Sequence, residues 1–160
     1  MTEHLFNVKR VARIICRIDD DKALEQTVRK IRHWTNSDIL STVGEKNTGT
    51  GVSRMYDENA VYIAALMLEI TRYGITVDML ETFEEWISEC WEETDDWEEA
   101  KSGQREVIFQ LGWQDNGSGF FCPVRDDKEL FWKPNGGAER EAYTSSIVVN
   151  VTNVFKRLNW

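Results

Sequence analysis

The sequence predicts a mixed α+β protein with three parts: a helical N-terminal part containing a glycine-rich hairpin, an acidic helix, and a small β-rich C-terminal module. Apolar residues recur at helical spacing through most of residues 5–101. After residue 103 the pattern changes to β-branched and aromatic runs separated by turn residues. Between these regions, residues 81–99 carry ten acidic side chains and no Lys or Arg. We therefore expect domains at 5–76, 77–101 and 104–160.

Length and composition place the protein among ordinary globular domains. It has 160 residues, of which two are proline and ten are glycine, and a formal net charge of −9. No apolar run is long enough for a signal peptide or a membrane span. The three cysteines, Cys16, Cys90 and Cys122, are far apart and suit thiols in a reducing compartment. We expect a cytoplasmic protein that does not contact membranes.

The negative charge is unevenly distributed along the sequence, so the net charge alone does not exclude binding to nucleic acid. Residues 1–76 hold 11 basic and 10 acidic side chains, a net charge of +1, whereas residues 77–160 hold 8 and 18, a net charge of −10. A uniformly acidic surface would repel a polyanion such as DNA. Segregated charge instead permits a basic binding face in the N-terminal half.

Two helices are predicted before residue 36. The first lies within residues 5–17, and the second begins at the aspartates 19–21, because aspartate is a favourable N-cap residue. This second helix extends to about Trp34, and Leu24, Val28 and Ile31 form its predicted buried stripe. At about 100° per residue, the opposite face is polar and cationic. It carries Gln26, Arg29, Lys30 and His33, with Arg32 at its flank.

Residues 41–54 read STVGEKNTGTGVSR, a composition typical of a hairpin or wing. Asp57 is then a candidate cap for a third helix that ends near Tyr73, with Gly74 as the residue after its C-cap. Thr76 and Asp78 open a fourth helix. Its apolar seam follows a coiled-coil spacing of 3 and 4. The seam consists of Leu80, Phe83, Ile87, Cys90, Thr94 and Trp97.

The C-terminal module is predicted to be mainly strands. EVIFQLGW and FFCPV flank a turn, and ELFW is a third candidate strand. TSSIVVNVTNVFKRL is read as a strand, with a helix from about Asn150 as the alternative. Its aromatic residues fit either a simple core or an apolar ligand pocket. They are Trp113, Phe120, Phe121, Phe131, Trp132 and Trp160.

Residues 27–74 resemble the winged helix-turn-helix DNA-binding domain of the MerR family of transcriptional regulators. The residues that match are Ile31, Arg32, His33 and Trp34, then Asp38, Ile39 and Leu40, then Gly51, Arg54, Tyr56 and Asp57, and finally Tyr73 and Gly74. Asp38 stands where the family usually has glycine, and His33 where it usually has tyrosine. The connection from the first helix is also longer than the family's tight turn.

The resemblance implies a recognition helix in the major groove of double-stranded DNA and a wing on the phosphate backbone. Arg32 and Arg54 would clamp the backbone, and Gln26, Arg29 and Lys30 would face the groove. The full candidate set for DNA binding is Gln26, Arg29, Lys30, Arg32, His33, Gly49, Gly51, Arg54 and Tyr56. Each feature also has a structural interpretation: a solvated helix face, a packing histidine, and glycines that only form a turn. Trp34 is interpreted as core.

The fourth helix allows two interpretations. MerR-like proteins form homodimers through a helix in this position, but the acidic residues that flank the seam would repel each other across such a pair. The seam would otherwise pack on its own chain. The C-terminal module is open to a small apolar ligand or a protein partner.

The sequence carries no motif for a cofactor, and its cysteines lack the spacing for a metal site. It has no catalytic motif either, so we expect no enzyme. The function predicted is a sequence-specific, DNA-binding transcriptional regulator. The alternative is a protein-interaction module or DNA mimic that binds a basic or DNA-binding partner through the acidic half.

Overall fold

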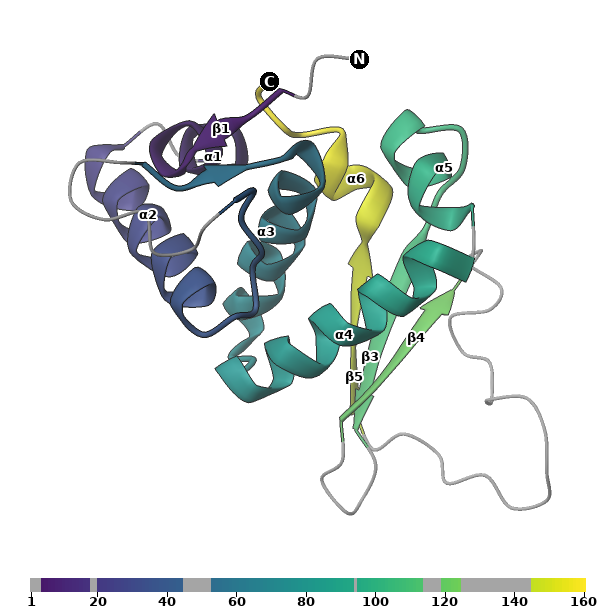
Figure 1. The fold of residues 1–160 in the computed structure, drawn as a ribbon. Helices are drawn as coiled ribbons and strands as arrows, with labels where there is room; N and C mark the ends of the chain where they lie inside the picture. Colours follow the sequence, from purple (N-terminus) through teal and green to yellow (C-terminus); the bar gives the residue numbers. More distant parts are fainter. Residues whose placement is uncertain (1–3, 18–19, 45–52, 94, 114–118, 125–144) are drawn as a thin grey trace, which may run out of the picture. The chain divides into compact units, whose positions relative to one another are not determined.

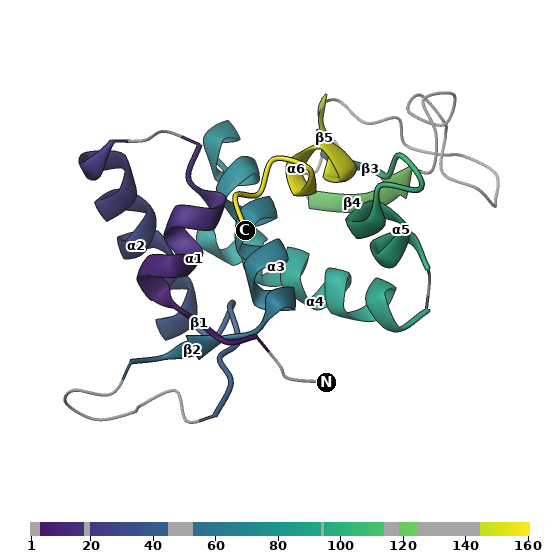
Figure 2. The ribbon, with the colours of Figure 1, turned by 90° about the horizontal axis from the view of Figure 1, so that it is seen from above.

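A computed structural model describes residues 4–17, 20–44, 53–93, 95–113, 119–124 and 145–160 (Figures 1 and 2). The chain divides into two compact units. The first comprises residues 1–84 together with 157–160, and the second comprises residues 85–156. The division lies within a helix, whereas the sequence placed domain limits at 76 and 101. The chain also returns to the first unit at its C-terminal end, which the sequence did not predict.

The first unit is mainly helical. Its elements are β1 (Phe6–Asn7), α1 (Val8–Ile15), α2 (Asp21–Asn36), β2 (Met55–Tyr56), α3 (Glu58–Ile70), the 3₁₀ helix η1 (Thr71–Tyr73) and the first part of α4 (Val77–Glu93). Helix α1 packs against both α2 and α3. Together with the strands and turns around them, these helices supply the core residues Val11, Ala12, Ile14, Ile31, Trp34, Ile39, Tyr56, Leu66 and Ile70, all at most 2% exposed.

Side-chain caps set where the helices begin. Asn7, Asp20 and Asp57 accept hydrogen bonds from the backbone N–H groups of Arg10, Ala23 and Ala60 at 3.0, 3.0 and 2.7 Å. Each cap satisfies one of the backbone donors that a helix start leaves unpaired. The predicted starts of α2 and α3 are thus confirmed. Gly74 follows η1 with a left-handed φ of 79°, the conformation expected of a residue that ends a helix.

The end of α2 is a Schellman motif with an unusual residue. Ile39 N–H donates to the Trp34 carbonyl at 3.0 Å, and Asp38 N–H donates to the Thr35 carbonyl at 3.3 Å. Asp38 has a φ of 60°, and among the described residues no other non-glycine residue has a positive φ. Ile39 and Trp34 are both buried, which provides the apolar contact that usually accompanies this motif.

The buried side of α2 differs from the predicted stripe. Ile31 is buried as expected, but Leu24 and Val28 are only half-buried. The buried set is Thr27, Ile31, Trp34 and Thr35. The two threonines tolerate burial because their hydroxyls donate to the carbonyls four residues earlier, each at 2.9 Å. A pattern that counts only apolar residues misses such positions.

A small antiparallel sheet lies beside the helices. Phe6 pairs with Tyr56 and Asn7 with Met55. An isolated bridge joins Val43 to Met55, whose carbonyl accepts from the Val43 N–H at 2.9 Å. The two ends of the glycine-rich segment are therefore hydrogen-bonded to each other. The middle of that segment lies outside the described residues.

The C-terminal residues complete the first unit. Asn159 N–H donates to the Ile14 carbonyl at 3.1 Å. The Trp160 ring lies 5.8 Å from that of Phe6 and 5.3 Å from that of Tyr62, measured between centroids. Trp160 therefore belongs to the first unit, and the expectation that it joins an aromatic cluster of the C-terminal module is wrong.

The second unit contains the end of α4, α5 (Asp96–Ser102), and a three-stranded antiparallel sheet followed by α6 (Val151–Phe155). The strands are β3 (Ile108–Trp113), β4 (Gly119–Val124) and β5 (Ser145–Asn150), in the order β4-β3-β5. Both predicted strands around the turn are confirmed, and so are the strand and helix on either side of Asn150, which caps α6. The predicted strand ELFW lies outside the described residues.

The acidic segment forms two helices, α4 and α5, instead of one helix over residues 77–101. Leu80, Phe83 and Ile87 of the predicted seam are at most 1% exposed in the single chain. Trp97, at the far end of the seam, stacks edge-on against Phe155 with ring centroids 4.8 Å apart. The described seam residues are therefore covered within their own chain.

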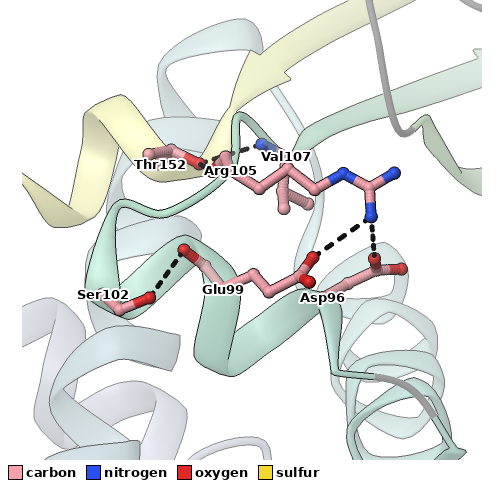
Figure 3. Close-up of polar contacts among 6 residues, drawn as sticks. All are labelled: Asp96, Glu99, Ser102, Arg105, Val107 and Thr152. Carbon is pink, nitrogen blue, oxygen red and sulfur yellow. Dashed lines mark hydrogen bonds and ion pairs between the residues drawn. The ribbon is translucent and has the colours of Figure 1, made fainter.

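A polar network attaches α5 to the start of β3 (Figure 3). The Arg105 guanidinium lies 3.1 Å from Glu99 and 3.8 Å from Asp96. The Thr152 hydroxyl accepts from Val107 N–H at 2.9 Å and donates to the Arg105 carbonyl at 2.8 Å. One hydroxyl thus satisfies two backbone groups at the point where β3 begins.

We predict that Thr152→Val destabilises the protein by about 1–3 kcal/mol, because the isosteric methyl removes the hydrogen-bond partner of the buried Val107 N–H and of the partly buried Arg105 carbonyl. Denaturant unfolding of the full chain measures this change. The exposed Thr82, whose hydroxyl bonds only within α4, provides the control. Thr82→Val should shift stability by less than about 0.5 kcal/mol, and equal effects of the two variants would contradict the role of Thr152.

We also predict that Trp160→Ala destabilises the protein by about 1–2 kcal/mol, since the ring is 48% exposed and makes two ring contacts. Tyr73 has a similar exposure of 53%. Tyr73→Ala should therefore change the unfolding midpoint much less than Trp160→Ala, and the reverse order would show that the C-terminal residues do not stabilise the first unit.

Candidate nucleic-acid interface

The outward side of α2 carries five polar or cationic side chains, which we call the α2 face. It consists of Gln26, Arg29, Lys30, Arg32 and His33, and all five are exposed. The side chains that fix the orientation of α2 lie on the other side of the helix. Ile31 and Trp34 are 0% and 2% exposed, so the predicted core role of Trp34 is confirmed. His33 does not take the packing role that the sequence left open.

The cations of the α2 face are only weakly engaged within the protein. Arg29 lies 4.0 Å from Glu25, with both side chains more than 70% exposed. Exposed pairs of this kind contribute little stability, and a stronger anion can replace the carboxylate. Lys30 donates from Nζ to the Thr71 hydroxyl at 3.2 Å, a neutral acceptor that leaves the ammonium charge uncompensated.

Next to the α2 face, the segment that leads into β2 is attached to the end of α2. Arg54 is half-buried and donates from Nη1 to Asn36 Oδ1 at 2.8 Å. This places the Arg54 guanidinium beside the C-terminal end of α2, close to the ends of the glycine-rich segment. Gly49 and Gly51 lie outside the described residues.

Tyr56 must be removed from the candidate contact set. Its side chain is 0% exposed, and its hydroxyl is 2.9 Å from the Thr35 hydroxyl in a buried hydrogen bond. A side chain enclosed in this way cannot reach a ligand at the surface. The sequence pattern could not show this, because a tyrosine hydroxyl suits a buried partner and a phosphate equally well.

A second cationic feature, absent from the sequence prediction, lies where α1 leads into α2. A cleft of about 460 Å³ is lined by Arg10, Arg13, Cys16, Arg17, Asp20, Asp21, Leu24 and Asn159. We call it the α1–α2 cleft. Arg10 and Arg13 lie three residues apart on one side of α1, and Arg17 follows two residues after that helix ends at Ile15. The spacing of Arg10 and Arg13 was a sequence signal for a shared helix face, but it did not indicate that Arg17 lies beside them.

Arg17 is held by an acidic partner on α3. Its guanidinium is 3.0 Å from Glu69, whose same oxygen also lies 3.2 Å from Arg72. Burial lowers the pKa of Arg17, Glu69 opposes this, and the nearby Arg72 and Arg157 add to the lowering. Because the ordinary pKa of arginine is very high, the guanidinium stays charged at neutral pH. The Glu69 carboxylate therefore pairs with two guanidinium groups, those of Arg17 and Arg72.

Other kinds of site are not evident in the part of the chain that the structure describes. It contains no group of three His, Cys, Asp or Glu residues placed to hold a metal ion. None of its helices has the length and apolar character needed to cross a bilayer. The proposed aromatic pocket of the C-terminal module depends on side chains outside the described set, apart from Trp160, which lies in the first unit.

A scan against models of protein families finds no match, and a search of characterised proteins finds no significant similarity.

Proposed function

We propose that this protein is a sequence-specific, double-stranded DNA-binding transcriptional regulator of MerR-like type, with α2 as its recognition helix. The observation that carries the proposal is the α2 face, where five adjacent polar or cationic side chains are exposed on a helix whose opposite side is buried. An α-helix fits the major groove, where Arg and Lys reach guanine edges or phosphates and Gln reaches adenine.

Two further features support the assignment. Asp38 adopts a left-handed conformation at the position where MerR-like proteins usually have glycine, the residue best suited to it. The hydrogen bond between Val43 and Met55 joins the ends of the glycine-rich segment, as the base of a wing requires. Arg54 at that base is within reach of a phosphate that α2 would bring close.

The acidic half sets a limit on affinity. Carboxylates outside the DNA-binding unit repel phosphate, so non-specific binding should be weak and specific contacts must supply more of the free energy. Several acidic residues are already paired within the chain: Glu98 with Lys101 at 2.7 Å, and Glu99 and Asp96 with Arg105. We favour DNA over the protein-interaction alternative because the cationic side chains of the α2 face are exposed on a helix whose opposite side is buried.

We also propose that the protein is cytoplasmic. Two copies would bind a palindromic DNA site together, as MerR-like regulators do. The described residues of the α4 seam are buried in the single chain. A dimer would therefore have to form through another surface. Selection of bound sequences from a random duplex pool tests symmetry directly, because a dimer selects two inverted half-sites about one helical turn apart.

We predict that Arg29→Ala weakens binding to a selected duplex by about 1–3 kcal/mol, roughly 5- to 150-fold, if Arg29 contacts a base edge. If it contacts only phosphate, the loss should be similar for all duplexes, and the salt dependence of log K should become shallower by about 0.9. Titration of a labelled duplex at several salt concentrations distinguishes these cases.

The matched control is Lys156→Ala, which removes an exposed cation from the second unit. It should leave both affinity and salt dependence unchanged. Equal losses in the two variants would show that the α2 face is not the interface. Absence of any duplex binding at low salt, together with capture of a basic protein, would favour the protein-interaction alternative.

A further inference from the structure

The α1–α2 cleft differs from the α2 face in position. Leu24, which lines the cleft, is two residues from Gln26, and at about 100° per residue the two point in nearly opposite directions from the helix axis. The cleft therefore lies behind the surface proposed to enter the major groove. The cleft arginines are therefore not part of the base-reading surface proposed for Gln26, Arg29 and Lys30.

The chemistry of the cleft suits a small anion that also carries hydroxyl groups. Arg10 and Arg13 are exposed, and in the described part of the chain their guanidinium groups make no ion pair or hydrogen bond. Guanidinium groups match phosphoryl oxygens in charge and geometry. Asp20 and Asp21 supply carboxylate acceptors on the facing side, although Asp20 already caps α2 through one oxygen.

Size and charge narrow the class of ligand. The cleft volume of about 460 Å³ exceeds what one phosphate ion fills and falls in the range of small-molecule sites. Of the three arginines in the lining, Arg17 is paired with Glu69, so Arg10 and Arg13 are the cations open to an anion. The Arg17 guanidinium is fixed by Glu69, so one of the three cations is oriented before a ligand arrives. Pre-orientation lowers the entropic cost of binding.

We propose that the α1–α2 cleft binds a phosphorylated small molecule with free hydroxyl groups, of which a sugar phosphate is the simplest type. The phosphoryl group lies among Arg10, Arg13 and Arg17, and the hydroxyls donate to Asp20 and Asp21. The leading alternative is that these arginines hold a backbone phosphate of DNA. This site does not depend on the proposed DNA-binding function.

The test uses the full chain and ribose 5-phosphate as the probe, titrated by calorimetry at constant ionic strength. We expect saturable binding that Arg13→Gln weakens roughly 10- to 100-fold, as loss of a charged hydrogen bond should. Arg29→Gln, on the α2 face, should leave this binding unchanged. Arg10→Gln provides a second variant, since Arg10 is also exposed and its replacement should not affect folding.

Three outcomes would overturn the proposal. The first is no saturable binding, and the second is equal binding of unphosphorylated ribose. The third is that Arg13→Gln weakens duplex binding while ribose 5-phosphate does not bind, which would assign the arginines to DNA. Because Arg13→Gln and Arg29→Ala act on different surfaces, failure of this proposal is distinguishable from failure of DNA binding.

Discussion

The burial of one side of α2 is the constraint on which the proposed interface depends. Ile31 and Trp34 are enclosed, and Thr35 bonds to the buried Tyr56 hydroxyl at 2.9 Å. Turning α2 about its axis to bury its polar face would expose Trp34 or break the Thr35–Tyr56 hydrogen bond. Either change would cost free energy. The cationic side chains of α2 therefore point to solvent because the opposite side is fixed.

In the second unit, hydrogen bonds and ion pairs hold the elements in place. Residues 108–112 of its central strand β3 are buried, and the start of the strand is held by backbone bonds to one hydroxyl, that of Thr152. The ion pairs of Arg105 with Glu99 and Asp96 hold α5 nearby. Part of the acidic segment thus has a structural role, and its charge cannot be counted in full as a binding surface.

Local signals predicted the elements of this protein well, because each depended on neighbouring residues. Asp20 and Asp57 cap the helices they were expected to cap, and Asn150 divides a strand from a helix. Contacts between distant segments were not predictable. Tyr56 was expected at the surface and Trp160 in the C-terminal module, because the place of each depends on contacts with residues far away in the sequence. The acidic segment was expected to form one helix, whereas it forms α4 and α5.

The sequence by itself determined the starts of α2 and α3, the strands β3 and β4, the segregation of charge, and the polar pattern of α2, since composition and spacing act locally. Only the tertiary structure decided which of those side chains are accessible. It enclosed Tyr56, left Arg29 and Lys30 exposed, and brought Arg10, Arg13 and Arg17 to one cleft with Asp20 and Asp21. The physical reason is that exposure and clustering depend on packing between helices, which no local pattern encodes.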